Sequence, residues 1–324
     1  MHKGIFTISL DFELFWGVRD HRTIESYGEN IRNVHHVVPR LLALFEKYDV
    51  HCTWATVGFL FLNDKKELIE NLPATRPGYQ KKEYDPYSYL EINELDPVYH
   101  FAPALIEQIK RTPGQELGTH TFCHFYTLEK NTTIEEFRSD LQAAIKVARQ
   151  KGCELKSIVF PRNQYSEEYI HVCLEEGIKI YRGNELSGAY KPVARENENK
   201  FRRAVRFADT YINITGHHCH PVPAAGKIIN VPASRFLRPY SPELKLFDGL
   251  KLKRIKNGLK FAAANGLIYQ LWWHPHNFGK FMDENFDFVE GVLKFYRQLN
   301  QEGKMTSQNL IEIYSNTNIN HAED

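Results

Sequence analysis

Four groups of polar residues in this sequence have side chains suited to acid–base or metal chemistry. Each group comes directly after a stretch with the composition of a buried strand. Asp11 and Glu13 follow "FTISL", His120 and His124 follow "QELGT", Arg162 follows "SIVFP", and His274 follows "IYQLWW". Because this placement recurs after separate strands, it is more informative than any one of the residues alone.

The first group is a pair of carboxylates, Asp11 and Glu13. Residues two apart on an extended strand point to the same face. Two carboxylates on one face repel each other unless a cation or a proton lies between them. The alternative is a strand that ends in two solvated acidic residues.

The second group is a pair of histidines, His120 and His124, within "HTFCH". The two imidazoles would share a face if the segment after Gly118 turned helically. Together with one carboxylate, they would form a ligand set typical of zinc or iron(II), with positions left for water and substrate. The chain has fifteen histidines, so ordinary polar contacts are the alternative.

A second histidine motif, "HHCHPVP", contains His217, His218 and His220. The segment is irregular and flanked by proline, and no preceding strand would hold it rigid. We expect it to form a loop wall near the pocket rather than the primary metal site.

Two further residue types suggest roles in binding. Trp272 and Trp273, beside His274, could form an apolar wall against a sugar ring, or could pack in the core. Arg162 could orient a carboxylate through two hydrogen bonds, or could form a surface ion pair.

Strand-like and helix-like segments alternate along the chain. A strand over 4–12, a helix over 29–48 and a strand over 50–61 form a βαβ unit, which implies parallel pairing. The alternation continues and predicts an α/β barrel, in which reactive groups come from the carboxyl ends of strands. We expect one catalytic barrel domain over 1–324, with irregular insertions near 71–100 and 184–245.

The composition is that of an ordinary globular protein. The 324 residues are 42% apolar and 25% charged, with a net charge of +1, so nothing marks a nucleic-acid or anionic-membrane binder. The five cysteines are scattered and form no CxxC pair, which favours reduced thiols. Asp11 and Glu13 interrupt the apolar N-terminal stretch, which is too short and too charged for a signal peptide or a membrane span. We therefore expect a cytoplasmic protein.

Together these motifs resemble those of the polysaccharide deacetylase superfamily, also described as carbohydrate esterase family four. Its members are distorted (β/α) barrels that hydrolyse acetamide groups on sugars and related amide bonds. Similar motifs occur here in the family's order: "SLDFE" (9–13), "HTFCH" (120–124), "FPRNQY" (160–165), "SRFLRPY" (234–240) for the vaguest of them, and "LWWHP" (271–275). The resemblance extends from Ile5 to about Ile313.

The resemblance implies a seven-stranded barrel and a metal-dependent hydrolase that removes an N-acetyl group from an amino sugar. Its implied roles are Asp11 as catalytic base, Arg162 as the cation that holds Asp11, His274 as general acid, and Glu13, His120 and His124 as ligands of a divalent metal, with Zn²⁺ as the first choice. His276 could replace His274 as the acid. A cytoplasmic member would act on a nucleotide- or lipid-linked sugar precursor rather than on a finished polymer.

One position departs from the family pattern. Many members have two adjacent aspartates in the first motif, but here Phe12 follows Asp11 and Glu13 is the next carboxylate. Because glutamate is one methylene longer, we expect the metal to lie farther from the strand. The departure keeps open an amidase or imidase that acts on a small linear or cyclic amide without a metal. A glycan-binding protein is a third alternative, although binding alone needs no acid–base set.

Overall fold

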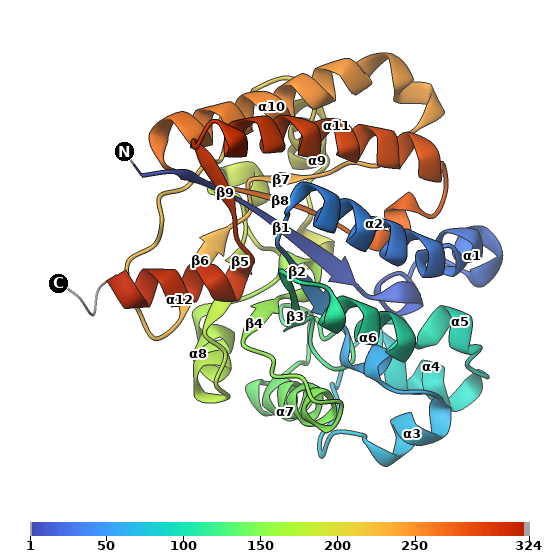
Figure 1. Cartoon of the computed structure of the whole chain (residues 1–324). Coiled ribbons are helices and arrows are strands. Elements are labelled where there is room, and N and C mark those ends of the chain that lie inside the picture. Colours follow the sequence, from blue (N-terminus) through green and yellow to red (C-terminus); the bar gives the residue numbers. More distant parts are fainter. Residues whose placement is uncertain (1, 321–324) are drawn as a thin grey trace.

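The computed structural model describes residues 2–320, and its centre is one curled sheet (Figure 1). Within these residues the sheet has nine strands, and all their pairings are parallel. Their order is β6-β5-β4-β3-β2-β1-β8-β7, and β9 pairs with β1. The strands are β1 (Gly4–Phe12), β2 (Cys52–Thr56), β3 (Gln115–Thr119), β4 (Ser157–Val159), β5 (Ile180–Gly183), β6 (Ile229–Pro232), β7 (Arg235–Phe236), β8 (Ile268–Trp273) and β9 (Met305–Ser307).

One extended segment, 229–236, joins the two ends of this sheet. Its first part, β6, pairs with β5, and its second part, β7, pairs with β8. Between them, the N–H of Ala233 donates to the carbonyl of Gly183 at 2.8 Å, and the N–H of Ser234 donates to that of Gln270 at 2.9 Å. The α/β barrel type is therefore confirmed. The expected count of seven strands is wrong, because this segment changes partner midway and contributes two strands to a path of eight.

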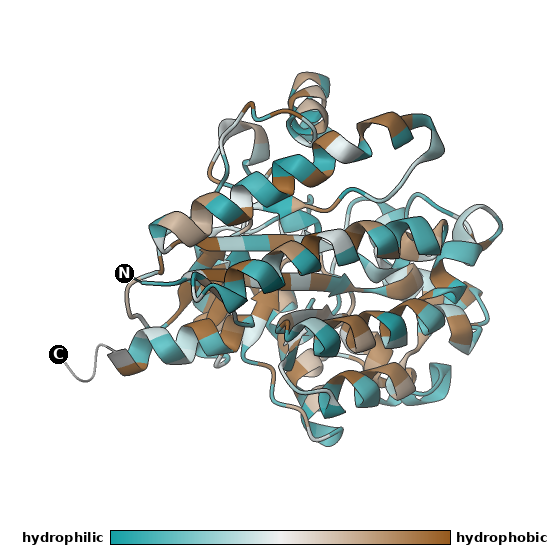
Figure 2. Ribbon diagram, turned by 45° about the horizontal axis from the view of Figure 1, so that its top comes forward, coloured by the Kyte–Doolittle hydropathy of each residue, from teal (hydrophilic) through white to brown (hydrophobic). Residues whose placement is uncertain are grey.

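Helices surround the curled sheet (Figure 1). They are α1 (Ile24–Arg32), α2 (Val34–Tyr48), α3 (Lys65–Glu70), α4 (Pro86–Ile92), α5 (Pro97–His100), α6 (Pro103–Arg111), α7 (Ile134–Gln150), α8 (Glu167–Glu175), α9 (Lys200–Asp209), α10 (Asp248–Asn265), α11 (Met282–Gln301) and α12 (Leu310–Asn320). Most are amphipathic, so apolar and polar residues alternate along them, whereas the strands are largely apolar (Figure 2). None of the helices within 2–320 combines the length and apolar character that a membrane crossing requires.

The register of the central strands brings the candidate residues to one edge of the sheet. β1 pairs Phe12 with Thr56 of β2, and Thr56 pairs with Thr119 of β3. On its other side, β1 pairs Leu10 with Trp273 of β8. Because all these strands are parallel, the residues that follow them meet at their carboxyl ends.

The two stretches expected to be irregular contain more regular structure than the sequence indicated. Residues 71–100 include α4 and α5. Residues 184–245 include α9 together with β6 and β7, the strands that join the ends of the sheet. The second stretch is therefore part of the barrel as well as part of its rim.

Candidate active site

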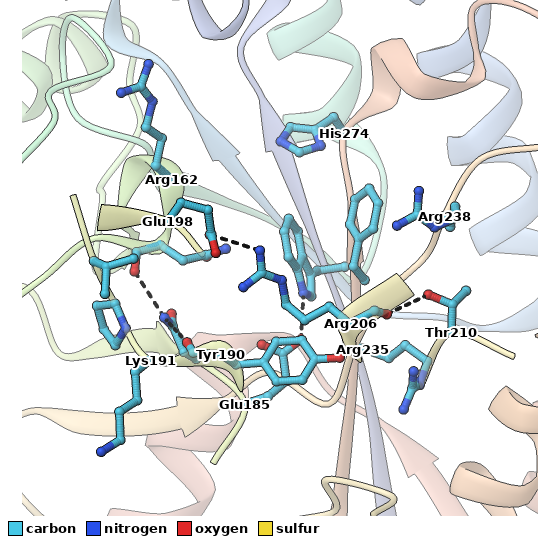
Figure 3. A pocket seen from close by; sticks show the side chains of 16 residues that line it. Arg162, Glu185, Tyr190, Lys191, Glu198, Arg206, Thr210, Arg235, Arg238 and His274 are labelled. Atoms are coloured by element: carbon cyan, nitrogen blue, oxygen red, sulfur yellow. Dashed lines mark hydrogen bonds and ion pairs between the residues drawn. The ribbon is translucent and has the colours of Figure 1, made fainter. Parts of the chain in front are cut away.

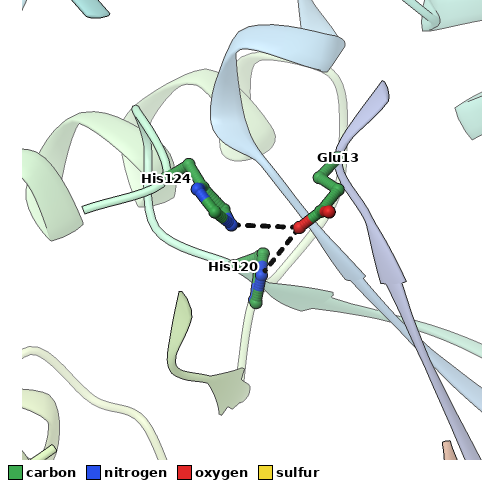
Figure 4. A group of neighbouring side chains, drawn as sticks. All are labelled: Glu13, His120 and His124. Carbon is green, nitrogen blue, oxygen red and sulfur yellow. Dashed lines mark ion pairs between the residues drawn. The ribbon is translucent and has the colours of Figure 1, made fainter. Parts of the chain in front are cut away.

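Glu13, His120 and His124 meet at the carboxyl edge of the sheet (Figure 4). Oε2 of Glu13 lies 3.0 Å from Nε2 of His124 and 3.3 Å from Nε2 of His120. All three side chains are buried, and their potential ligand atoms lie within 4.8 Å of one another. The structure thus brings together the three residues expected to hold a metal.

The outer ring nitrogens of both histidines already have partners. Nδ1 of His120 lies 2.7 Å from the carbonyl of Val159, and Nδ1 of His124 lies 3.3 Å from the hydroxyl of Tyr126. Since a carbonyl only accepts, Nδ1 of His120 carries the proton and Nε2 presents a lone pair to Glu13 when the ring is neutral. Burial also lowers the pKa of His124 to about 4. Neutral imidazoles around a carboxylate fit a divalent cation.

The backbone between the two histidines is a left-handed turn rather than the expected helical one. Thr121 and His124 have φ of 65° and 64°, and no residue from 120 to 124 is helical. Asp140 of α7 fixes this turn by accepting the N–H groups of Phe122 at 2.7 Å and of Cys123 at 3.1 Å. Such a conformation persists when surrounding contacts determine it.

Glu13 reaches the histidines because Gly17 leaves room for its side chain. Glu13 stands just after β1, with φ −133° and ψ −11°, so the strand has already ended there. A Cβ atom on Gly17 would lie 2.0 Å from the carboxyl carbon of Glu13. The longer side chain of glutamate therefore folds back over a glycine to reach His120 and His124.

Asp11 is held by an arginine that sequence reasoning missed. Arg182, on β5, donates to Oδ1 of Asp11 at 2.6 Å and to Oδ2 at 2.9 Å. It also donates to Asn163 at 2.9 Å, and its guanidinium carbon lies 4.3 Å from the ring centroid of Trp272. Burial acts to raise the pKa of Asp11, but Arg182 and nearby His120 outweigh it, so the pKa is lowered. The signal available in the sequence was Arg182 itself, a charged residue in the strand-like segment "IKIYRG" (178–183).

The expectation that Arg162 holds Asp11 is wrong. Arg162 pairs instead with Asp20 and with Glu129, the latter at 3.1 Å, and its guanidinium carbon lies 3.6 Å from the ring centroid of Tyr126. Its backbone is left-handed, with φ 56°, and the side chain leaves the strand end toward these acidic partners. Its neighbour Asn163 is the residue of this motif that reaches the arginine on Asp11.

His274 lies between the two carboxylates. Its Nε2 is 3.7 Å from Oδ2 of Asp11 and 3.6 Å from Oε1 of Glu13. Its side chain is 23% exposed, whereas His276, whose Nε2 lies 3.9 Å from Glu13, is buried. Burial lowers the pKa of His276 to about 3, and the nearby His274 contributes. His274 is therefore the histidine of this pair that solvent can reach.

A cavity of about 290 Å³ opens beside this cluster (Figure 3). His274, Trp272 and Phe236 form part of its wall. Trp272 thus lines the cavity, whereas Trp273 is fully buried in the core. Apolar rings next to a candidate acid are suited to contact with a sugar ring.

The histidines of "HHCHPVP" have structural contacts, and the ring of His218 packs 5.5 Å from that of Tyr190, which lines the cavity. Nε2 of His218 lies 2.7 Å from the hydroxyl of Thr215, and Nε2 of His220 lies 3.3 Å from the carbonyl of Ala233. Nδ1 of His217 lies 3.0 Å from Arg254. Among the residues that the structure describes, none of the three lines the cavity, so the expected pocket wall is wrong.

Comparison with solved structures addresses the fold. A protein assigned as a polysaccharide deacetylase from Mycobacterium smegmatis aligns with 98% of this chain and 92% of its own, with a TM-score of 0.59 and 12% identity. The chain has the fold of the polysaccharide deacetylases. Another protein assigned to these enzymes, from Pseudomonas aeruginosa PAO1, gives a TM-score of 0.52 at 11% identity over 96% of this chain and 89% of its own.

The polysaccharide deacetylase fold is shared with other enzymes. The allantoinase PuuE aligns with 96% of this chain and 88% of its own, with a TM-score of 0.54 and 10% identity. No protein-family model matches the sequence, and no protein of curated function does. Any inference about the reaction therefore depends on the residues of the site.

Proposed function

We propose that this protein is a metal-dependent hydrolase that removes an N-acetyl group from an amino sugar. The observation that carries the proposal is the position of Glu13, His120 and His124 beside a buried Asp11 and a solvent-accessible His274. Two imidazoles and one carboxylate suit Zn²⁺, which is the metal we infer. When bound, the ion would polarise the acetyl carbonyl and increase the acidity of water.

Asp11 acts as the general base in this proposal. The reaction adds water across the amide bond, and Asp11 takes the proton that the attacking water loses. Arg182 keeps the carboxylate ionised and fixes both of its oxygens, because bidentate hydrogen bonds orient the group as well as stabilise its charge. The base is therefore ready at neutral pH.

His274 acts as the general acid. An amine is a poor leaving group unless it receives a proton as the C–N bond breaks. His274 is within 4 Å of both carboxylates and borders the cavity, so its Nε2 can face the departing nitrogen. The products are acetate and the free amino sugar, whose ring would lie against Trp272 and Phe236.

Three variants and one control test the proposal. His120→Ala and His124→Ala should each abolish bound metal, measured by elemental analysis after purification without chelator. Asp11→Asn should retain the metal and lose acetate release from an N-acetylated sugar. His171→Ala, at an exposed histidine on α8, is the matched control and should change neither. Full activity of Asp11→Asn would show that the assignment of the base is wrong.

Hydrolysis of a small linear or cyclic amide is the second candidate. The observation that favours it is the cavity volume of about 290 Å³, just below the roughly 300–1,000 Å³ usual for ligand pockets. The same metal-loaded protein can be assayed with a ureide or imide. Turnover of such a substrate without release of acetate from any acetamido sugar would favour this candidate.

A further inference from the structure

The cavity beside the candidate metal centre is rich in cationic side chains (Figure 3). They come from several parts of the chain, including α9, β7 and the segments that follow β4 and β5. Its cationic lining residues are Arg162, Lys191, Arg206, Arg235 and Arg238, against the two acidic residues Glu185 and Glu198. Neither the fold nor the proposed acetamide chemistry requires this excess of positive charge.

Ion pairs with acidic residues account for most of the cations. Arg206 pairs with Glu198 at 2.9 Å, and Arg235 pairs with the buried Asp209 at 3.0 Å. Arg162 has the two acidic partners described above. The charges of these three arginines are therefore balanced by carboxylates of the protein itself.

Arg238 and Lys191 differ from those arginines. Neither forms an ion pair with any residue in 2–320. Arg238 is half-buried, its Nε meets no acceptor in this part of the chain, and its guanidinium carbon lies 5.0 Å from the ring centroid of Phe207. The cavity thus contains a partly desolvated guanidinium with no internal anion to balance it, an arrangement that costs free energy unless an anion binds.

The acidic residue Glu185 does not supply that anion. It is buried, and burial raises the pKa of its carboxyl above the usual value. Its Oε1 lies 3.5 Å from Nε1 of Trp272. Glu185 is therefore directed toward the tryptophan, while Arg238 and Arg206 both line the same cavity (Figure 3).

We propose that Arg238 forms a subsite for an anionic group of the substrate, a phosphate or a carboxylate. The inference rests on the proposed function, because the acetamide of the same substrate would face His274, which lines the same cavity. A planar guanidinium suits both anions, since it can donate two parallel hydrogen bonds to either. The substrate class is thus an acetamido sugar that carries a phosphate or a carboxylate.

Calorimetric titration of the metal-loaded protein tests the subsite with three probes. N-acetylglucosamine is the neutral probe, N-acetylglucosamine 1-phosphate carries a phosphate, and N-acetylglucosaminuronate carries a carboxylate. At least one charged probe should bind about tenfold or more tightly than the neutral one, and which of them does so identifies the anion. Arg238→Gln should abolish the preference for the charged probe. Arg238→Lys should retain part of it, because lysine keeps the positive charge but cannot donate two parallel hydrogen bonds.

Arg111→Gln on α6 is the matched control, because this arginine is 81% exposed and remote from the cavity. It should leave all three affinities unchanged. Thermal unfolding of each variant confirms that it is folded. A preference for a charged probe that survives in Arg238→Gln, or no preference among the probes in the wild type, including no binding of any, would overturn the proposal.

The outcome is separable from that of the proposed function. Loss of the charge preference in Arg238→Gln would establish the subsite even if no probe released acetate, in which case the deacetylase proposal alone would fail. Conversely, acetate release with equal affinity for charged and neutral probes would leave the deacetylase proposal intact and remove the subsite.

Discussion

Arg182 forms a bidentate ion pair with Asp11 across the interior of the curled sheet. Their two hydrogen bonds measure 2.6 and 2.9 Å, and both side chains are buried. Arg182 lies on β5 and Asp11 on β1, and three strands separate β5 from β1 in the sheet order. The contact is therefore made through the core of the curled sheet, whose two ends are joined by segment 229–236.

We expect Arg182→Lys to lower kcat for acetate release on the order of 100-fold, because Asp11 would lose one of its two aligned donors. Arg182→Gln should lower kcat further, and it should also destabilise the fold by about 3–5 kcal/mol, because it removes one partner of a buried ion pair. Loss of the cation raises the pKa of Asp11, so the acidic limb of the pH–rate profile should shift to higher pH. Bound metal should be unchanged in Arg182→Lys.

Arg162→Gln provides the comparison for this prediction. Because Arg162 contacts Asp20 and Glu129 rather than Asp11, its replacement should leave the acidic limb of the profile in place. A shift of that limb in Arg162→Gln, with none in Arg182→Gln, would reverse the assignment of the two arginines.

The prediction of Arg162, where the structure has Arg182, shows what the sequence alone could not determine. The apolar runs and the polar residues that follow them were enough to predict the barrel, and the resemblance to the deacetylase motifs predicted that Glu13 would meet His120 and His124. Which arginine crosses the interior depends on the register and tilt of β5, and these are set by tertiary contacts. A motif match favoured Arg162, whose left-handed backbone directs it elsewhere.

Segment 229–236 escaped prediction for a related reason. Its residues alternate only weakly between apolar and polar, and β7 has two residues. The segment is extended because β5 and β8 both offer it hydrogen-bond partners, and neither partner is near it in sequence. Its strand character is thus a property of the assembled sheet.

His274→Ala should lower kcat for an acetamido sugar on the order of 100-fold or more, because the leaving amine would lose its proton donor. An activated aryl acetamide, whose amine leaves more easily, should be affected much less. His276→Ala should cost less turnover, since His276 is buried and its pKa of about 3 leaves it neutral at pH 7. Steady-state kinetics with both substrates measure the difference.

Bound metal should be measured for both histidine variants, so that a loss of metal is not mistaken for the loss of an acid. Equal sensitivity of the two substrates to His274→Ala would argue against a role in protonating the amine. A larger effect of His276→Ala on the acetamido sugar, with metal retained, would transfer the role to His276.

Asp140 should make the stability of the fold depend on pH between about 4 and 6. Burial raises the pKa of its carboxyl from 3.8 to about 6, although the N–H groups of Phe122 and Cys123 oppose the change. The folded state therefore binds this proton more tightly than the unfolded state does. The resulting stabilisation is fully present below pH 3.8 and is lost as the pH rises through 6, a change of about 3 kcal/mol.

Asp140→Asn isolates this contribution, because asparagine does not titrate. The free energy of unfolding of the wild type, minus that of the variant, should fall as the pH rises from 4 to 7 and then level off, measured by urea denaturation of metal-free protein. A difference independent of pH would contradict the raised pKa. The variant should also bind metal more weakly, since an amide offers one acceptor where the carboxylate offers two to the turn between His120 and His124. Aspartate would then be favoured at this position by the metal site despite its cost to stability at neutral pH.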